Sequence, residues 1–122
     1  MERRLSAVLI SDVVGYTKLM ESDTEGTVKA WSEARDGVIE PVILGASGRI
    51  VKFTGDGFLA EFNNVQAALE SAVEIQSRLK TAPIKFRMAI NFGDVIDDGK
   101  DIHGEGVNIA ARLETLCEPG GI

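Results

Sequence analysis

The stretch Arg49-Ile-Val-Lys-Phe-Thr-Gly-Asp-Gly-Phe-Leu-Ala-Glu-Phe62 decides the fold, because it predicts two short strands joined by a tight turn. Arg49–Thr54 and Phe58–Phe62 are rich in β-branched and aromatic residues. Between them, Gly55-Asp56-Gly57 is typical of a β-hairpin turn. A hairpin in the middle of the chain needs further elements on both sides to cover it.

The chain before the hairpin predicts a buried strand and then a helical region. Ala7-Val-Leu-Ile-Ser-Asp-Val13 is a short, β-branched apolar run that ends near Gly15. Ser22-Asp-Thr-Glu25 has the pattern of a capping box at a helix start. Pro41 is expected to kink or end that helix. The apolar stripe at helical spacing consists of Val28, Trp31, Ala34 and Val38.

The chain after the hairpin predicts a second helix, a strand, an arm and a last helix. Asn63 or Asn64 can cap the second helix, and Lys85–Phe92 alternates as a half-buried strand does. The segment 93–104 is acidic and broken by glycines, which predicts a protruding hairpin, and Val107–Leu116 predicts the last helix. The expected apolar stripe of the second helix is Val65, Ala68, Leu69, Ala72, Ile75 and Leu79.

The resulting order β-α-β-β-α-β predicts an α+β fold with a ferredoxin-like core. Both helices of such a unit lie on one face of an antiparallel sheet, so the other face is free for a partner or a site. Residues 1–122 are expected to form a single domain, since the length suits one.

Composition excludes several classes of protein. Thirteen Lys and Arg against nineteen Asp and Glu give a net charge of −6, which argues against binding to nucleic acid. No apolar run approaches the ~20 residues of a membrane helix, and we see no signal peptide. The single cysteine, Cys117, rules out an internal disulfide and fits a reducing compartment. A cytoplasmic location is therefore expected.

Two aspartates lie where the predicted fold can bring them together. A carboxylate at the end of a buried strand, as at Asp12, is costly unless it is paired or binds a metal. The first strand lies beside the hairpin in this topology, so Asp56 at the hairpin tip can approach it. Converging carboxylates suit Mg²⁺, with phosphate oxygens completing the shell. Taken alone, Asp12 is also a plausible helix cap, and Asp56 is an ordinary residue for a turn.

Three further groups of polar residues are candidates for chemistry. Val13–Thr17 leads from a strand into a helix, where free amides can bind phosphate. Asn108 and Arg112 are four residues apart and share a helix face, so they can hold a ribose oxygen and a phosphoryl oxygen; the alternative is a solvated face. Lys52 is expected to share its strand face with Ile50 and Thr54, as a solvated side chain or a ligand contact.

Three motifs together resemble the class III nucleotidyl cyclase catalytic domain, most closely that of bacterial adenylate cyclases. They are Ser11-Asp-Val-Val-Gly-Tyr16, Lys52-Phe-Thr-Gly-Asp-Gly57 and Asp101-Ile-His-Gly-Glu-Gly-Val-Asn-Ile-Ala-Ala-Arg112. The resemblance runs from about Arg4 to Ile122, and its specificity lies in the joint order and spacing of the motifs. It implies conversion of ATP to 3′,5′-cyclic AMP and pyrophosphate in cyclic-nucleotide signalling.

The resemblance also implies the metal and phosphate ligands. Asp12, Asp56 and the backbone carbonyl of Val13 match the positions that hold two Mg²⁺ (or Mn²⁺) ions in the family. The segment that meets the triphosphate corresponds to Val14, Gly15, Tyr16 and Thr17. No side chain is an obvious general base, and the only histidine, His103, is expected on the surface of the arm.

The remaining matches imply an active site shared between two subunits. Lys52 and Asp101 match the residues that recognise adenine, Asn108 the residue that orients the ribose, and Arg112 the residue that stabilises the transition state. In the family one domain supplies the metal ligands and the other supplies these groups, which implies a head-to-tail homodimer. Lys52 can only donate and ionised Asp101 can only accept, which complements adenine but does not exclude guanine.

Some alternatives stay open at this point. The resemblance leads us to expect more strands, a helix and a triphosphate-binding lysine after Ile122, so these residues are expected to be a weakly active or inactive truncated domain. A catalytically silent dimerisation or nucleotide-binding module and a guanylate cyclase are the rival interpretations. A diguanylate cyclase is disfavoured because Gly55-Asp-Gly-Phe58 lacks the doubled acids of that family.

Overall fold

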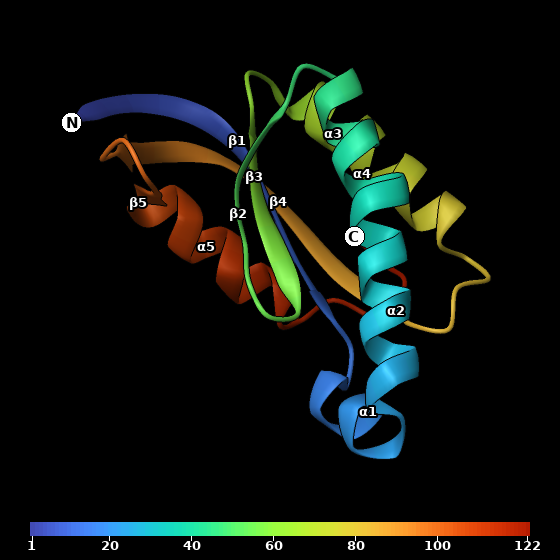
Figure 1. The fold of residues 1–122 in the computed structure, drawn as a ribbon. Coiled ribbons are helices and arrows are strands. Elements are labelled where there is room, and N and C mark those ends of the chain that lie inside the picture. Colours follow the sequence, from blue (N-terminus) through green and yellow to red (C-terminus); the bar gives the residue numbers. More distant parts are fainter.

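Five strands and five α-helices make up the computed structural model, which describes residues 1–122 (Figure 1). No helix is both long and apolar enough to cross a membrane. In chain order the elements are β1 (Glu2–Val13), α1 (Tyr16–Ser22), α2 (Thr24–Ala34), the π-helical turn η1 (Arg35–Ile39), α3 (Glu40–Gly45), β2 (Arg49–Phe53), β3 (Gly57–Phe62), α4 (Val65–Arg78), β4 (Phe86–Asp97), β5 (Ile102–His103) and α5 (Glu105–Glu114).

The sheet has the order β2-β3-β1-β4-β5, and all neighbouring strands are antiparallel. The ferredoxin-like core predicted from the sequence is therefore confirmed, with β1 at the centre between β3 and β4. Strands β1 and β4 are longer than predicted, because β1 begins at Glu2 and β4 continues to Asp97. The acidic segment forms the expected hairpin, in which β5 pairs only with the end of β4. From Phe86 to Val95 the outer edge of β4 has no strand partner.

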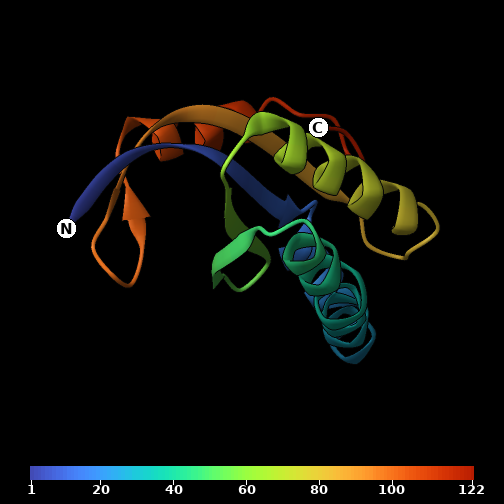
Figure 2. The same cartoon turned by 90° about the horizontal axis from the view of Figure 1, so that it is seen from above.

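Helices cover both faces of the sheet, which differs from the expectation of one free face. The main core lies between the sheet and the helices from α2 to α4, and it includes Leu9, Trp31 and Phe86. Figure 2 shows α5, in orange-red, beside β4 and away from α2 and α3, and a second cluster around Val8, Leu59 and Ala110 packs α5 against the opposite face. Gly106 permits this contact, because a Cβ there would lie 2.8 Å from the Asp94 carbonyl oxygen.

The first helical region runs past Pro41, so of the two predicted outcomes, a kink or an end, the end does not occur. In η1 the amide of Glu40 donates to the carbonyl of Arg35, five residues back, instead of the usual four. This wider turn interrupts the pattern of helical hydrogen bonds just before Pro41. An ordinary helix would need an N–H donor at that position, and proline has none. Asp23, and not Ser22, caps α2 by accepting from the Gly26 amide.

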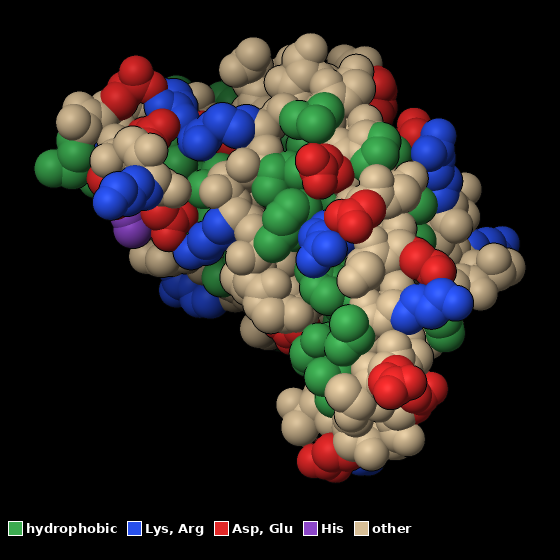
Figure 3. Space-filling model, in the orientation of Figure 1, with side chains coloured by type: hydrophobic (Ala, Val, Ile, Leu, Met, Phe, Trp, Pro, Cys, Tyr) green, Lys and Arg blue, Asp and Glu red, His purple; other side chains and the backbone are tan.

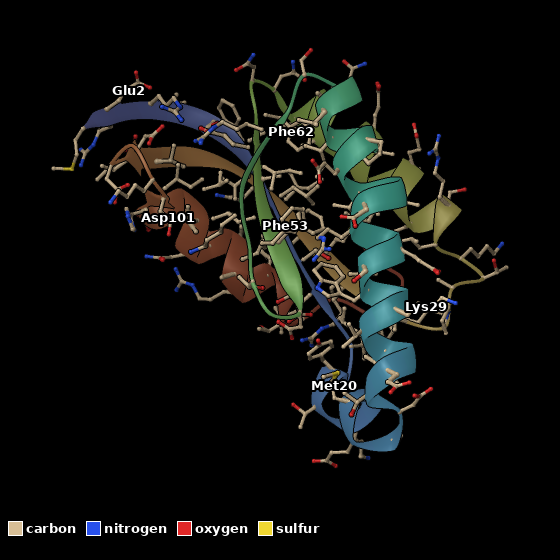
Figure 4. The ribbon with its side chains drawn as sticks, viewed as in Figure 1. Glu2, Met20, Lys29, Phe53, Phe62 and Asp101 are labelled. Atoms are coloured by element: carbon tan, nitrogen blue, oxygen red, sulfur yellow. The ribbon has the colours of Figure 1, made fainter.

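The aromatic side of the main core forms where α2 meets β2 and β4. Figure 4 shows Phe53 between β2 and α2, and its ring meets the Trp31 ring edge-on with 6.2 Å between centroids. Val28 was predicted to share this stripe but is 44% exposed, and Thr27 is buried in its place. On α4, the predicted cap Asn64 accepts from the Ala67 amide. The buried residues of the helix are Ala68, Ser71, Ala72 and Ile75, and Leu79 is buried just after its end. Val65 and Leu69, also predicted for that stripe, are exposed.

A network of charged side chains joins β1, β2, β3 and β4 near the N-terminal end of β1. Arg4 holds the buried carboxylate of Glu61 with two hydrogen bonds of 2.7 and 2.8 Å, and it also reaches Asp97 at 3.0 Å. Arg49 binds Glu61 at 2.8 Å. Figure 3 shows side chains of both signs gathered at this end, on the left, near the single histidine. Burial alone raises the pKa of Glu61, but hydrogen bonds from Arg4, Ser6 and Arg49 outweigh it and lower the pKa to about 2.

We expect Glu61→Gln to destabilise the domain by about 1–3 kcal/mol at neutral pH, because Arg4 loses its buried anionic partner. The depressed pKa makes this contribution fully present above the ordinary value of 4.5, and it is lost as the pH falls towards about 2. Urea unfolding of both proteins across that pH range measures the difference. Glu33→Gln, in an exposed pair with Lys29, is the control. Equal stability of Glu61→Gln and wild type at neutral pH would contradict the expectation.

Candidate active site

Asp12 and Asp56 lie on neighbouring strand ends, as the sequence predicted. Asp12 pairs with Gly57 in the β1–β3 ladder, and the Val13 amide donates to the Asp56 carbonyl at 2.8 Å. Gly57 makes this approach possible, because a Cβ at that position would sit 2.0 Å from the Ser11 carbonyl oxygen. The glycine of the hairpin therefore places the Asp56 residue directly beside the end of β1.

Two residues that the sequence analysis did not single out surround Asp12. Arg87 faces Asp12 across the β1–β4 pair, and its Nη2 lies 3.3 Å from Asp12 Oδ2. Glu114 enters from α5 and is 6% exposed. Burial, then a hydrogen bond with Asp12 and the charge of Asp12, raise the pKa of Glu114 to about 7. A sequence signal existed for Glu114, because Gly106, Ala110 and Glu114 recur every four residues on the buried face of α5.

The segment from Val13 to Thr17 turns sharply from β1 into α1. Gly15 has φ +64°, a left-handed conformation that favours glycine, and it precedes α1 without a side-chain cap. The Val14 amide already donates to the Lys85 carbonyl at 2.8 Å, so it is not available to a phosphate. The amides of Gly15, Tyr16 and Thr17 donate to no backbone carbonyl, which leaves three of the four predicted positions free to bind an anion.

Lys52 and Asp101, which are far apart in the sequence, form an ion pair. Lys52 Nζ lies 2.7 Å from Asp101 Oδ2, and this hydrogen bond is the main cause of the lowered pKa of Asp101. Figure 4 shows Asp101 in the β4–β5 turn beside α5.

The predicted sheet face of Lys52 is wrong, because β2 contains a β-bulge. Between Ile50 and Lys52 the β2–β3 register shifts. Ile50 and Phe53 consequently both pack on the main core, while Val51 packs on the α5 side. The bulge changes the alternation of faces along β2, so Lys52 reaches Asp101, next to the buried Ile102.

Asn108 and Arg112 lie one turn apart on α5, and both side chains are exposed without a hydrogen-bonding partner in the chain. Glu114, which faces Asp12, is two residues beyond Arg112 and so points to the opposite side of the helix. The chain thus brings together Asp12 with Asp56, Lys52 with Asp101, and Asn108 with Arg112. It does not bring the Asn108–Arg112 face towards its own Asp12. His103 is exposed, as expected, and pairs with Asp98 at 2.8 Å.

The donor set around Asp12 fits a hard divalent cation that also binds a substrate. No group of three or more His, Cys, Asp or Glu residues is arranged to hold a metal ion by itself. Asp12 and Asp56 supply oxygen donors from adjacent backbone positions, and magnesium sites of nucleotide enzymes commonly combine one or two carboxylates with phosphate oxygens. The free amides that follow Gly15 lie next to this position in the chain, where such phosphates can be held.

Comparisons with known proteins give consistent relatives, although no family model matches the chain. It is 39% identical over an alignment of 134 residues to a "putative adenylate cyclase 3" of Rhizobium meliloti, covering all of this chain and 22% of that protein. It is 31% identical to an adenylate cyclase of Glutamicibacter nicotianae, covering 95% of this chain and 29% of that protein. The chain therefore spans less than a third of the length of these curated relatives.

Solved structures agree with these relatives. An "adenylate/guanylate cyclase/hydrolase" from Silicibacter pomeroyi is 44% identical with a TM-score of 0.88, covering 98% of this chain and 74% of that one. The adenylyl cyclase CyaB from P. aeruginosa is 26% identical with a TM-score of 0.81, covering 98% of this chain and 76% of that one. Sequence and fold thus point to the same group of proteins.

Proposed function

Because the chain belongs to the class III adenylate/guanylate cyclase catalytic-domain family, we propose that it converts ATP to 3′,5′-cyclic AMP and pyrophosphate. The observation that carries this proposal is the meeting of Asp12 and Asp56 at adjacent strand ends, beside the uncapped start of α1.

Asp12, Asp56 and the carbonyl of Val13 are the residues that would hold two Mg²⁺ or Mn²⁺ ions. When bound, such ions lower the pKa of the ribose 3′-hydroxyl and neutralise charge on the leaving pyrophosphate. The chain's own contribution is to orient the triphosphate, for which the amides of Gly15, Tyr16 and Thr17 are free. The 3′-oxygen then attacks the α-phosphorus in line, and the α–β phosphoanhydride bond breaks.

Base recognition is assigned to the Lys52–Asp101 pair. Lys52 donates to N1 of adenine, and Asp101 accepts from its 6-amino group. The lowered pKa of Asp101 keeps the carboxylate ionised and therefore able only to accept. Because guanine presents an acceptor and a donor on the same edge, guanylate cyclase activity remains the second candidate for this site.

Asn108 and Arg112 would complete the site from a second copy of the chain. Both lie on the outward side of α5, and neither is engaged by another side chain. Arg112 would stabilise charge that develops on the phosphoryl oxygens, while Asn108 would hold the ribose so that attack is aligned. A head-to-tail homodimer brings this face of one subunit to the Asp12 and Asp56 of the other, which creates two equivalent sites.

A cyclase assay with ATP and GTP side by side, in Mg²⁺ and in Mn²⁺, tests the proposal. We expect cyclic AMP and pyrophosphate from ATP as the main products. Cyclic GMP as the main product would establish the guanylate alternative. No cyclic nucleotide with either ion would favour a catalytically silent dimerisation or nucleotide-binding module.

The double variant Lys52→Glu with Asp101→Cys is expected to lower the ratio of kcat/KM for ATP to that for GTP by roughly 10–100-fold. The charge of Lys52 is reversed and the acceptor at Asp101 is lost, so the adenine edge meets unmatched groups. Initial rates with both nucleotides give the ratio. Lys29→Glu with Asp36→Cys changes the same residue types on the helical region of α2 and η1, away from the pair, and serves as the control. An unchanged ratio would show that Lys52 and Asp101 do not recognise the base.

A further inference from the structure

Arg87 holds the carboxylate of Asp12 only loosely. Its Nη2 lies 3.3 Å from Asp12 Oδ2 and 3.4 Å from Oδ1, and its Nε lies 3.4 Å from Oδ1. Ion-paired hydrogen bonds of this kind are ordinarily about 2.7–2.9 Å long. One guanidinium thus covers both oxygens of the proposed metal ligand without a close bond to either.

A second set of acceptors for Arg87 lies at the end of α5. Glu114 Oε1 is buried, accepts no hydrogen bond, and is 3.4 Å from Arg87 Nε. The carbonyl of Thr115 lies 3.4 Å from Arg87 Nη1. Backbone carbonyls at a helix C-terminus carry partial negative charge, which favours a cation there. A small movement of Arg87 towards α5 would therefore give a buried, unpartnered oxygen its missing donor.

The two cations compete for the same oxygens. A guanidinium across both oxygens of Asp12 repels a divalent ion that approaches them, and this repulsion is strong in a half-buried site. Leaving Glu114 Oε1 without a donor is also unfavourable, because a buried unsatisfied acceptor loses its hydration. Moving Arg87 from Asp12 to Glu114 relieves both costs together.

We propose that Glu114 is a positioning residue that draws Arg87 away from Asp12 and so frees this carboxylate for a divalent cation. The inference rests on the proposed function, in which Asp12 is a metal ligand. It assigns a role to the inward face of α5 that is separate from the outward Asn108 and Arg112. Glu114 acts through Arg87 and makes no contact with substrate in this account.

Mn²⁺ binding to the 122-residue chain, measured by calorimetric titration, tests the inference without catalysis. We expect Glu114→Gln to weaken Mn²⁺ binding about tenfold, because Arg87 then remains on Asp12. Arg87→Met should bind Mn²⁺ at least as tightly as wild type. In the Arg87→Met background, Glu114→Gln should change the affinity by less than about twofold. Glu105→Gln, on the exposed first turn of the same helix, is the matched control.

The double-mutant cycle separates this role from simple electrostatics or packing. If Glu114→Gln weakens Mn²⁺ binding equally with and without Arg87, or has no effect, the inference is overturned. Thermal unfolding of each variant shows whether it is folded, and Arg87→Gln replaces Arg87→Met if the latter is not. Asp12→Asn separates the proposed metal site from the positioning role of Glu114. If this variant binds Mn²⁺ as wild type does, the proposed metal site is wrong. If it loses Mn²⁺ binding but the cycle shows no coupling between Arg87 and Glu114, only the positioning role is overturned.

Discussion

Asp12→Asn is expected to lower cyclic AMP formation by roughly 10³-fold or more, since removing a charged metal ligand forfeits several kcal/mol of transition-state stabilisation. The asparagine keeps the size and most of the hydrogen-bonding capacity of the side chain. Arg87 retains Glu114 and the Thr115 carbonyl as acceptors, so the fold should persist. Initial rates measured with saturating ATP and Mn²⁺, together with thermal unfolding, check both parts.

The control for this variant is Asp36→Asn, which removes an exposed carboxylate paired with Arg35 on η1. It should leave the rate unchanged, because Asp36 lies on an exposed part of the helical region. An Asp12→Asn protein that is folded and retains activity within about tenfold of wild type would show that Asp12 does not bind the catalytic ions.

Mixing two inactive proteins is expected to restore activity. Asp12→Asn and Arg112→Ala each damage both sites of their own homodimer. In a mixed dimer one site receives both altered residues and the other receives none. With random exchange of subunits, about one quarter of wild-type activity should return. The physical reason is that Asp12 lies against the inward side of α5, whereas Arg112 of the same chain points outward from this helix. The two residues therefore serve different sites.

The measurement is the rate of an equimolar mixture against each variant alone at the same total concentration. Asp12→Asn mixed with Asp56→Asn is the control pair, because both substitutions damage the same half of the site and leave no intact site in the mixed dimer. No recovery with Arg112→Ala, although mixed dimers form, would mean that the site does not combine these residues across subunits.

Local pattern was sufficient to predict the strand order of the core. The hairpin from Arg49 to Phe62 fixes two adjacent antiparallel strands, and the apolar run ending at Val13 can only be buried beside them. The meeting of Asp12 with Asp56 follows from this topology. Glycine was the decisive local signal, since Gly57 tolerates no side chain against the Ser11 carbonyl.

Features that depend on tertiary contacts escaped prediction. The bulge at Val51 changes which side chains of β2 lie on each face of the sheet. Nothing in an alternating sequence pattern indicates such an extra residue. The π-helical turn carries the helix past Pro41 and shifts which residues face the core. Arg87 and Glu114 lie on elements distant in sequence, so their meeting at Asp12 required the packing of α5 on β4 and β1.

Anomalous diffraction tests whether Asp12 and Asp56 jointly bind divalent cations. Crystals grown with Mn²⁺ and a non-reactive ATP analogue locate the ions independently of any activity. We expect manganese peaks within bonding distance, about 2–2.5 Å, of carboxylate oxygens from both aspartates. Manganese found only at the acidic β4–β5 hairpin, or bound to neither carboxylate while the nucleotide is present, would contradict it.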